Sequence, residues 1–556
     1  WILDPTQDAV FIIAAPLLVL ALSLLTFHFV DAGDAAALII LVHMVMTVAH
    51  HLPTFIRIYG DVDLFRRFKW TFLLGPLVPL TFAAGALTYI NLHNYPVENF
   101  LYLFILLAIW DPYHFLMQHY GFMRIYDRHN RAPQRLASRM DLWLCVGWFA
   151  FIMLAATDWL AGLLEDLFNT AQLPLFALIP DGALPLLTNI AAALAIAMTV
   201  AYVLYVVWCR RQGYFVSRAK LSLFVVTFGV MYLAYTPNQW IMQWAPGWSF
   251  KVGFAALGIV HMTQYLAIVW RYNRSLAAHP QRSRPGWFRC LHARGGWIVA
   301  AGYVIFCLSY GEVLTGTHGG RWLMSVLMAA GFTSTLMHYY FDGFIWKMRH
   351  RQTRENLAMT DVVDKPAPEL RMPASTAAAP SVERQPQRFS IALRQLCYFG
   401  IPMTALTLGA ILSWSGPGAN YAAHMYQAQL LSQQGHADQA LSEARIAFAS
   451  MSRQLPFARK LAQLQPTSAR KAALALVVYN RSKYQDLLLP TLSGTTPDTA
   501  QLADYRASLD EAAHALDGAL RMGGSLAGTG HEKMTAADGQ RMLDSWKSEL
   551  QRLQNG

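Results

Sequence analysis

The sequence predicts an all-α membrane protein, a bundle of about eleven membrane-spanning helices followed by a small soluble helical domain. Composition is the first reason: of the 556 residues, 55% are hydrophobic and 14% are charged, and the mean hydropathy is +0.29. Soluble domains average about 25% charged residues. The second reason is a series of apolar segments of about 20 residues, the length that crosses a bilayer. The third is the content of 17 Trp, 24 Tyr and 30 Phe, which suits aromatic belts at both interfaces.

Eleven segments have the apolar length of a membrane span. The ninth is the shortest of them. Prolines in residues 171–182, between the fifth and sixth segments, predict an interfacial or re-entrant piece. The expected spans are residues 9–30, 35–57, 70–91, 98–123, 141–163, 184–208, 218–237, 249–271, 296–312, 321–346 and 392–414.

The placement of Lys and Arg predicts the orientation of these spans. Basic residues occupy the loops after spans two, four, six, eight and ten, and the loops after spans one, three, five and seven carry none. Because cytoplasmic loops are enriched in Lys and Arg, even-numbered spans are expected to end in the cytoplasm. The N-terminus is then cytoplasmic. The tail lies outside, in the periplasm of a bacterial inner-membrane protein.

Composition divides the chain into four expected regions. Residues 351–390 are rich in Pro, Ala and Ser with mixed charge. Such a segment cannot bury a core, so it is expected to be a disordered cytoplasmic linker. The four regions are a ten-span membrane core (1–350), the linker (351–390), an eleventh span that acts as a tether (391–415) and an extracytoplasmic helical domain (416–556).

The start of the tail domain, residues 421–450, has the pattern of a helix, a turn and a second helix. Ala428, Gly435, Ala440 and Ala447 fall where a tetratricopeptide repeat wants small residues, so the piece resembles one such repeat of about 34 residues. A plain helical bundle is the alternative, because repeat solenoids usually need about three repeats. This domain is expected to dock a protein partner.

Four of the apolar segments carry ionisable or amide side chains. Such residues are costly in lipid and are usually kept for a function. Helical spacing places the members of each set on or near one face of their helix. They are His43, Thr47, His50 and His51 on span two; Asp111, His114, Gln118 and His119 on span four; His261, Gln264 and Tyr265 on span eight; and His338 and Asp342 on span ten.

These histidines are expected to lie at one depth. His114 and His261 each precede the arginine at the end of their span by ten residues, and His338 precedes Lys347 by nine. At 1.5 Å per residue, the imidazoles sit roughly 10–15 Å inside the basic residues. Four helices running in the same direction therefore present imidazoles in one layer.

Neutral imidazole is the commonest metal ligand, so this layer predicts a metal centre. An all-histidine or histidine-plus-carboxylate set in a helix bundle suits iron, mononuclear or dinuclear, with zinc or copper as alternatives. A histidine that only hydrogen-bonds a neighbouring helix is the other interpretation, preferred for His28 and His43. The predicted ligands are His50, His51, His114, His119, His261 and His338; the supporting or alternative ligands are Asp111, Gln118, Gln264, Tyr265, Asp342 and His43.

Two helix ends have similar sequences. Residues 55–59 read FIRIY and residues 122–126 read FMRIY. This similarity indicates either a trace of internal repetition or arginines that snorkel toward the interface beside a tyrosine.

The arrangement of histidines from several spans near one membrane surface is similar in kind to two families. These are the membrane di-iron desaturases and hydroxylases and the polytopic carotene-cleaving oxygenases of the Brp/Blh type. The resemblance is architectural and covers the ten-span core. The HxxHH boxes of the first family are absent, since this chain has only Val48-Ala49-His50-His51. No catalytic residue is carried over.

Two functions from different classes remain open. The first is an iron-dependent membrane oxidoreductase that acts on a hydrophobic, lipid-like small molecule. The second is a non-enzymatic subunit of a larger membrane complex, with the histidines binding haem b for electron transfer or joining helices. Nucleic acid is not expected as a partner, because the basic residues follow the alternation of loops. The five cysteines include no CxxC pair, which argues against a cysteine-based zinc site.

Overall fold

The part of the chain that the structure describes is helical. A computed structural model describes residues 1–93, 97–156, 159–164, 182–236, 238–279, 286–294, 297–315, 320–346, 388–414, 421–464, 466–523 and 534–555, with Tyr95, Phe168, Leu175, Ile179, Pro180, Ser283 and Leu526. These residues form no strand, and Asp61 and Ser283 make an isolated β-bridge. The all-α prediction is confirmed for them. Residues 351–387 of the predicted linker lie outside the described residues.

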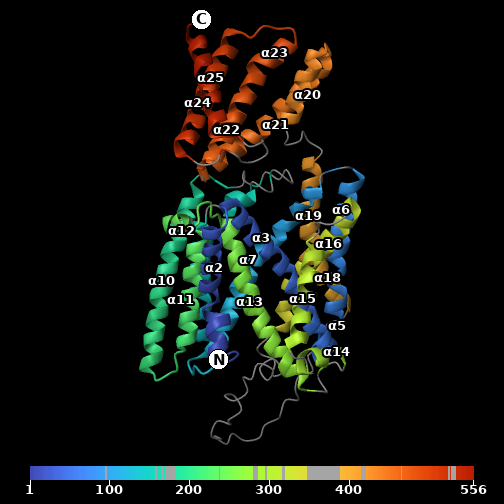
Figure 1. Ribbon diagram of the computed structural model, residues 1–556, viewed down its shortest axis with the longest axis vertical. Helices are drawn as coiled ribbons and strands as arrows, with labels where there is room; N and C mark the ends of the chain where they lie inside the picture. Colours follow the sequence, from blue (N-terminus) through green and yellow to red (C-terminus); the bar gives the residue numbers. More distant parts are fainter. Residues whose placement is uncertain are drawn as a thin grey trace, which may run out of the picture. The chain divides into compact units, whose positions relative to one another are not determined.

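The chain divides into two compact units. Unit 1 comprises Trp1–Ala156 and Leu184–Ala405, and unit 2 comprises Thr157–Ala183 and Leu406–Gly556. The elements of unit 1 (Figure 1) are α1 (Pro5–Gln7), η1 (Asp8–Ile13), α2 (Ala15–Phe29), α3 (Ala32–Ala49), α4 (His51–Gly60), α5 (Val62–Leu74), α6 (Leu77–Leu92), η2 (Val97–Leu103), α7 (Phe104–Tyr126), α8 (Gln134–Ala155), α10 (Ala183–Arg211), α11 (Arg218–Tyr235), α12 (Gln239–Trp244), α13 (Phe250–Ala277), α14 (Trp287–Arg289), η4 (Cys290–Arg294), α15 (Trp297–Leu314), α16 (Arg321–Ile345), α18 (Arg388–Gln395), η6 (Leu396–Gly400) and the start of α19 (Ile401–Trp414).

Eight helices among the described residues are long and apolar enough to cross a membrane, and nine if the bent pair Pro5–Ile13 and Ala15–Phe29 is one span. Their length and composition are those of a multi-pass membrane protein. Two of the eleven expected spans are not among them. Ile298–Leu314 in α15 is a shorter apolar helix, and α16 carries the polar face of the candidate site, which lowers its hydropathy.

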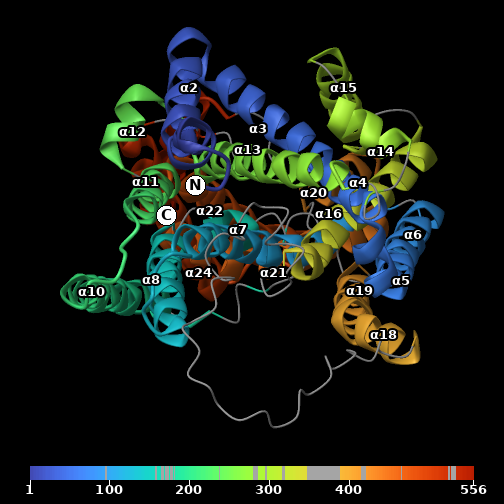
Figure 2. The same cartoon turned by 90° about the horizontal axis from the view of Figure 1, so that it is seen from below.

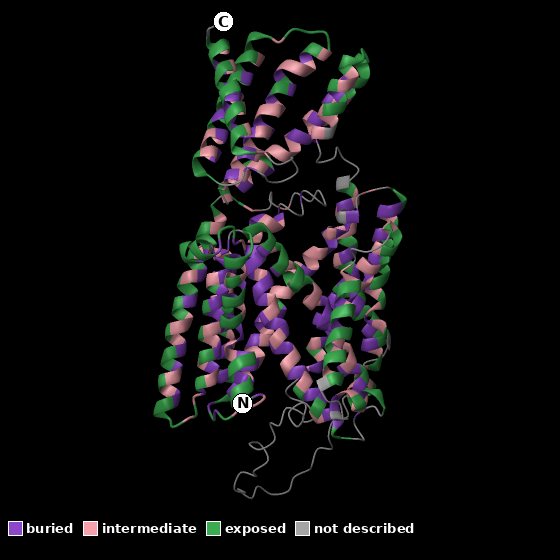
Figure 3. Cartoon of the chain, in the orientation of Figure 1, coloured by how far each residue is buried: buried purple, intermediate pink, exposed green. Residues whose placement is uncertain are grey.

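The surface of unit 1 fits an apolar surrounding. Large hydrophobic side chains are exposed along its outer helices, and Figure 3 colours many residues of these helices as exposed. On α10, for example, Leu186, Ile196 and Leu204 are each more than 60% exposed. Exposed apolar surface this continuous is unusual on a soluble monomer and suits contact with lipid. Viewed along the helices, α10 and α15 lie at the edge of the unit (Figure 2).

The start of the expected eleventh span packs against the other helices of unit 1. Phe399 in η6 stacks on Trp110 of α7 with ring centroids 6.0 Å apart, and it meets Tyr340 of α16 edge-on at 5.2 Å. This part of the segment therefore contributes to the core of unit 1.

A buried ionic network joins α7, α8 and α11. Lys220 Nζ lies 2.8 Å from Asp127 Oδ1 and 3.0 Å from Asp141 Oδ1. Arg124 Nη1 contacts the second oxygens of the same two carboxylates, at 2.9 and 2.6 Å. Both aspartates are fully buried and Lys220 is 2% exposed. Two cations thus alternate with two anions, so each buried charge is compensated.

Unit 2 contains α20 (Tyr421–Gln433), α21 (Ala437–Leu464), α22 (Ser468–Ser482), η7 (Lys483–Leu488), α23 (Leu489–Leu492), α24 (Thr499–Met522) and α25 (Ala536–Asn555). The predicted helix–turn–helix at its start is present. Gly435 has φ +81° in the turn, a conformation that glycine adopts at low cost. Ala428, Ala440 and Ala447 are buried. The likeness to a tetratricopeptide repeat stays a prediction.

The end of the expected fifth span (141–163) and the loop after it belong to unit 2, because α8 ends at Ala155 and unit 2 begins at Thr157. Ala161, Leu164 and Phe168 form a hydrophobic cluster with Phe457 and Leu461 of α21. The rings of Phe168 and Phe457 lie 4.3 Å apart. Of the predicted interfacial piece at 171–182, only Leu175, Ile179, Pro180 and Gly182 are described.

Replacing the buried lysine of the ionic network should destabilise unit 1. Lys220→Met leaves two buried carboxylates with one cation, a loss that typically costs about 3–5 kcal/mol. We expect a clear drop in the midpoint of thermal unfolding in detergent. Arg218→Met, two residues earlier on α11 at an exposed position, is the control and should change the midpoint little. Equal shifts for both variants would show that the network does not stabilise the fold.

Candidate metal centre

Five of the six predicted histidine ligands converge in the interior of unit 1. The ring of His338 is central, with centroids 4.4 Å from His50, 4.8 Å from His51 and 5.0 Å from His114. His261 lies 4.9 Å from His114 and 5.5 Å from His50. All five residues are buried. The structure therefore brings together side chains from α3/α4, α7, α13 and α16.

A helix break lies between two consecutive histidines of the site. His50 caps α3, and α4 starts at His51. Pro53 follows at the third position of α4 and cannot donate to the carbonyl of Ala49, which weakens the helix at this point. The sequence pattern predicts one continuous helix here. His50 has φ −75° and ψ −11°, close to the helical region, and both imidazoles lie beside His338.

Two groups of side chains have the spacing of metal ligands. His50, His261 and His338 offer donor atoms that all lie within 4.8 Å of one another, and His114, His338 and Asp342 do the same. His338 Nε2 lies 3.0 Å from His50 Nε2 and 3.9 Å from Asp342 Oδ2. His114 Nε2 lies 3.5 Å from Asp342 Oδ2. The groups share His338, so they are neighbouring parts of one site.

A closed series of hydrogen bonds supports His338 and Asp342. His338 Nδ1 and Thr54 Oγ1 are 2.9 Å apart, and Thr54 Oγ1 and the Tyr265 hydroxyl are 2.6 Å apart. Tyr265 donates to Asp342 Oδ1 at 3.0 Å. Because the tyrosine proton goes to Asp342, Thr54 must donate to Tyr265. Thr54 can then only accept from His338, so Nδ1 of His338 carries its proton and Nε2 has the free lone pair.

His50 has the same tautomer by the same reasoning. Its Nδ1 lies 3.3 Å from the carbonyl oxygen of Met46, which can only accept. The proton of a neutral His50 is therefore on Nδ1, and its Nε2 also presents a lone pair. Two such lone pairs face each other across 3.0 Å. Without a cation or a proton between them, this contact is repulsive.

Several other polar atoms of the site make no hydrogen bond in the part of the chain that the structure describes. They are Nε2 of His51, Nε2 of His114 and both ring nitrogens of His261. An unsatisfied buried polar atom typically costs about 1–3 kcal/mol. Several of them around one point indicate a missing ligand, because buried polar groups are otherwise satisfied.

The predicted supporting residues divide into two sets. Asp342 and Tyr265 contact the histidines through the hydrogen bonds above. Asp111 accepts from Tyr339 at 2.8 Å and lies at the edge of the site. Gln264 instead donates to the carbonyl of Ile12 at 2.8 Å, an acceptor left free because Pro16 has no N–H. Gln118 donates to the backbone carbonyl of His261 at 3.2 Å. The two amides thus hold helices together.

His119 and His43 lie apart from the cluster. The ring of His119 meets Phe228 of α11 edge-on, with centroids 5.0 Å apart, and its nitrogens have no partner among the described residues. His43 packs against Phe254, and a Cβ on Gly258 would lie 2.2 Å from its Nε2. His119 follows His114 by five residues, which turns it to another face of α7.

The side chain of Arg57 does not extend to the membrane interface, although one interpretation of the similar helix ends at 55–59 and 122–126 predicts this. It is 1% exposed. Its guanidinium carbon lies 3.7 Å from the ring centre of Tyr272 and 3.9 Å from that of Trp346. Its Nη2 donates to the carbonyl of Ile345 at 2.8 Å. Such stacking stabilises a buried guanidinium and joins α4, α13 and the end of α16.

Sequence reasoning missed three residues at the site. Thr54 bonds His338, Ser334 lies 3.2 Å from His51 Nδ1, and Tyr339 bonds Asp111. Helical spacing could have found two of them. Thr54 follows His50 by four residues, and Ser334 precedes His338 by four, so each shares a helix face with a histidine.

No protein-family model, no curated protein and no solved structure matches the chain. The fold and the site geometry are therefore the observations that bear on function.

The hydrogen-bond series predicts the effect of two conservative variants. Thr54→Val and Tyr265→Phe keep the side-chain shape but remove the groups that orient His338 and Asp342. Loss of such supporting contacts typically lowers metal affinity about 10- to 100-fold. Competition with a metal chelator measures this change. Tyr310→Phe, which removes a hydroxyl bonded to Ser334 at 2.8 Å outside this series, should have a smaller effect. Unchanged affinity in both test variants would contradict the assigned role.

Proposed function

We propose that the chain is an integral-membrane, metal-dependent oxidoreductase that acts on a hydrophobic, lipid-like substrate at the histidine cluster. The contact between His50 and His338 carries the proposal. Hydrogen bonds leave a lone pair on each Nε2, and the two atoms are 3.0 Å apart. A bound metal ion would replace this repulsion by coordination of both nitrogens, whereas a buried imidazolium would have to be desolvated.

The distances support a single metal centre. Two ligands at about 2.1 Å from one ion are roughly 3.0–3.4 Å apart at octahedral or tetrahedral angles. The His50–His338 and His114–Asp342 separations of 3.0 and 3.5 Å fall close to this range. His338 offers only Nε2 to both groups, and one nitrogen lone pair binds one ion. Either His50, His261 and His338 or His114, His338 and Asp342 would hold it, with the other members of the cluster beside them.

The donor set favours iron, with zinc or copper as alternatives. When bound, such an ion supplies Lewis acidity and, for iron or copper, electron transfer. The residues of the chain fix its position: Thr54 and Tyr265 orient the imidazole and carboxylate ligands. The surrounding helices keep bulk water away. A lipid-like substrate is favoured because the site is buried within helices of membrane length.

The geometry favours a non-haem centre over haem b. Two axial histidine nitrogens on a haem iron stand on opposite sides of the macrocycle, about 4 Å apart at bonds of about 2 Å. The separation of 3.0 Å between His50 and His338 is shorter. The rings of His51, His114 and His261 also lie close to this pair, where a planar macrocycle would have to fit.

The proposed location is a bacterial inner membrane, with the N-terminus in the cytoplasm and the tail domain in the periplasm. The alternation of basic loops supports this orientation. Further support comes from unit 2, where Phe168 of the loop after span five packs on Phe457 of the tail domain. The proposed orientation places both the loop after span five and the tail domain on the periplasmic side of the membrane. The tail domain is then available to dock a periplasmic protein.

Metal analysis with one ligand variant and one matched variant tests the proposed function. Purified protein is expected to contain close to one equivalent of a transition metal, and His338→Ala should lose most of it. His119→Ala removes an equally buried imidazole outside the cluster, so its metal content should match that of the unchanged protein.

An optical spectrum of the same samples separates the alternatives. Iron without a Soret band supports the non-haem centre, and a Soret band supports haem. Absence of any transition metal from unchanged, folded protein would overturn the proposal. Equal metal loss from His338→Ala and His119→Ala would show that the cluster is not the binding site.

A further inference from the structure

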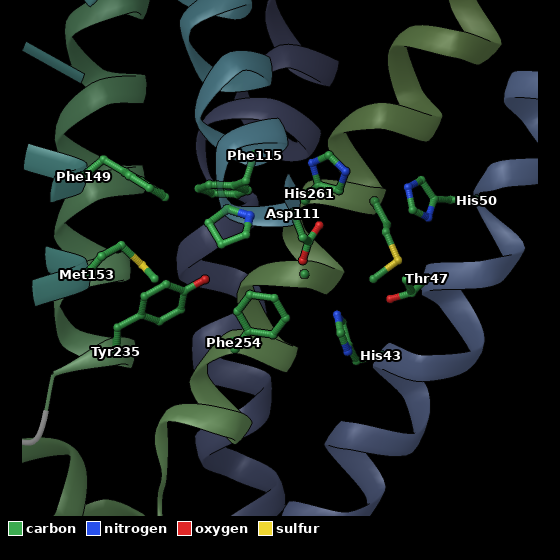
Figure 4. A pocket seen from close by; sticks show the side chains of 13 residues that line it. His43, Thr47, His50, Asp111, Phe115, Phe149, Met153, Tyr235, Phe254 and His261 are labelled. Atoms are coloured by element: carbon green, nitrogen blue, oxygen red, sulfur yellow. The ribbon is translucent and has the colours of Figure 1, made fainter. Parts of the chain in front are cut away.

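A small internal cavity adjoins the histidine cluster. Its volume is about 30 Å³, and the side chains of His50 and His261 form part of its wall. Figure 4 shows these two rings at one end of the cavity, together with His43, Thr47 and Asp111. Two of the proposed metal ligands therefore line this space, and the other three do not.

The remainder of the wall is apolar apart from the hydroxyl group of Tyr235. Figure 4 shows Phe149 and Met153 of α8 at the end away from His50, with Phe115 and Phe254 between. Tyr235 of α11 closes the same end. The cavity thus runs from a polar end at the histidines to an aromatic end at α8 and α11. The aromatic end therefore favours uncharged molecules over ions.

The volume limits what the cavity can hold. One water needs roughly 10–15 Å³ by the same measure, so about 30 Å³ accommodates two water-sized bodies. A hydrocarbon chain or a ring is too large. Water is a poor occupant of the aromatic end, because an ordered water needs about two to four polar partners. A diatomic, uncharged molecule fits both the size and the wall.

We propose that this cavity is the binding chamber for a diatomic gas, dioxygen, next to the metal centre. The inference rests on the proposed function, since it requires a metal at the histidines, and it adds the second reactant and its place. The lipid-like substrate is then expected to reach the metal by another route. Residues that line the chamber, and bind no metal, should control access of the gas.

Nitric oxide is the probe for this chamber, because it is diatomic and gives distinctive optical and electron paramagnetic resonance spectra on ferrous iron. The experiment uses the full chain loaded with ferrous iron in detergent without oxygen. Thr47→Leu adds bulk beside His50, and Met153→Trp adds bulk at the aromatic end. Each should weaken or slow nitric oxide binding by about tenfold or more, because overpacking a tight cavity is costly. Phe149→Ala enlarges the chamber and should speed binding.

Thr81→Leu is the matched control. Thr81 is exposed on α6, and its hydroxyl bonds only to carbonyls of its own helix, so the same added atoms should leave nitric oxide binding unchanged. Iron content is measured for every variant. If Thr47→Leu does not fold, Met153→Trp and Phe149→Ala still decide the outcome, because their expected effects have opposite signs.

The two proposals can fail separately. No iron in the unchanged protein overturns the proposed function and this inference with it. Full iron content, with nitric oxide binding equally in Met153→Trp, Phe149→Ala and the unchanged protein, overturns the chamber alone and leaves the metal centre standing.

Discussion

The close approach of two imidazole nitrogens is the constraint on which the candidate site depends. His50 and His338 each use Nδ1 for a hydrogen bond, so both present an unprotonated Nε2 to the other at 3.0 Å. In a buried site this contact is unfavourable unless a cation lies between the nitrogens. The neighbouring unsatisfied nitrogens of His114 and His261 point to the same conclusion. Metal binding would therefore also stabilise the packing of the helices that carry these rings.

The surrounding fold holds these helices in place at two levels. Near the site, Thr54, Tyr265 and Asp342 connect α4, α13 and α16 by hydrogen bonds. Closer to the helix ends, Arg57 is stacked between Tyr272 of α13 and Trp346 after α16. In lipid, polar contacts and close packing replace the hydrophobic effect as the means of joining helices. The polar residues of unit 1 thus serve both the assembly of the bundle and its candidate site.

Helix breaks occur at two places near the candidate site, at Pro16 and at His50. Proline removes a backbone donor, and the freed carbonyl must find another partner where no water is present. Gln264 supplies that partner for Ile12, opposite Pro16. At His50 the break between α3 and α4 falls between two consecutive histidines of the cluster.

The sequence by itself determined the helical class, most of the membrane-length segments and the common depth of four histidines. Periodicity and distance along a helix axis are local quantities, so counting from the basic residues sufficed to align His114, His261 and His338. The tertiary structure decided which neighbours face each other. It separated His119 from His114, turned Gln118 and Gln264 to backbone carbonyls, and buried Arg57. These outcomes depend on helix rotation, on breaks at proline and on partners from distant segments, none of which a local pattern contains.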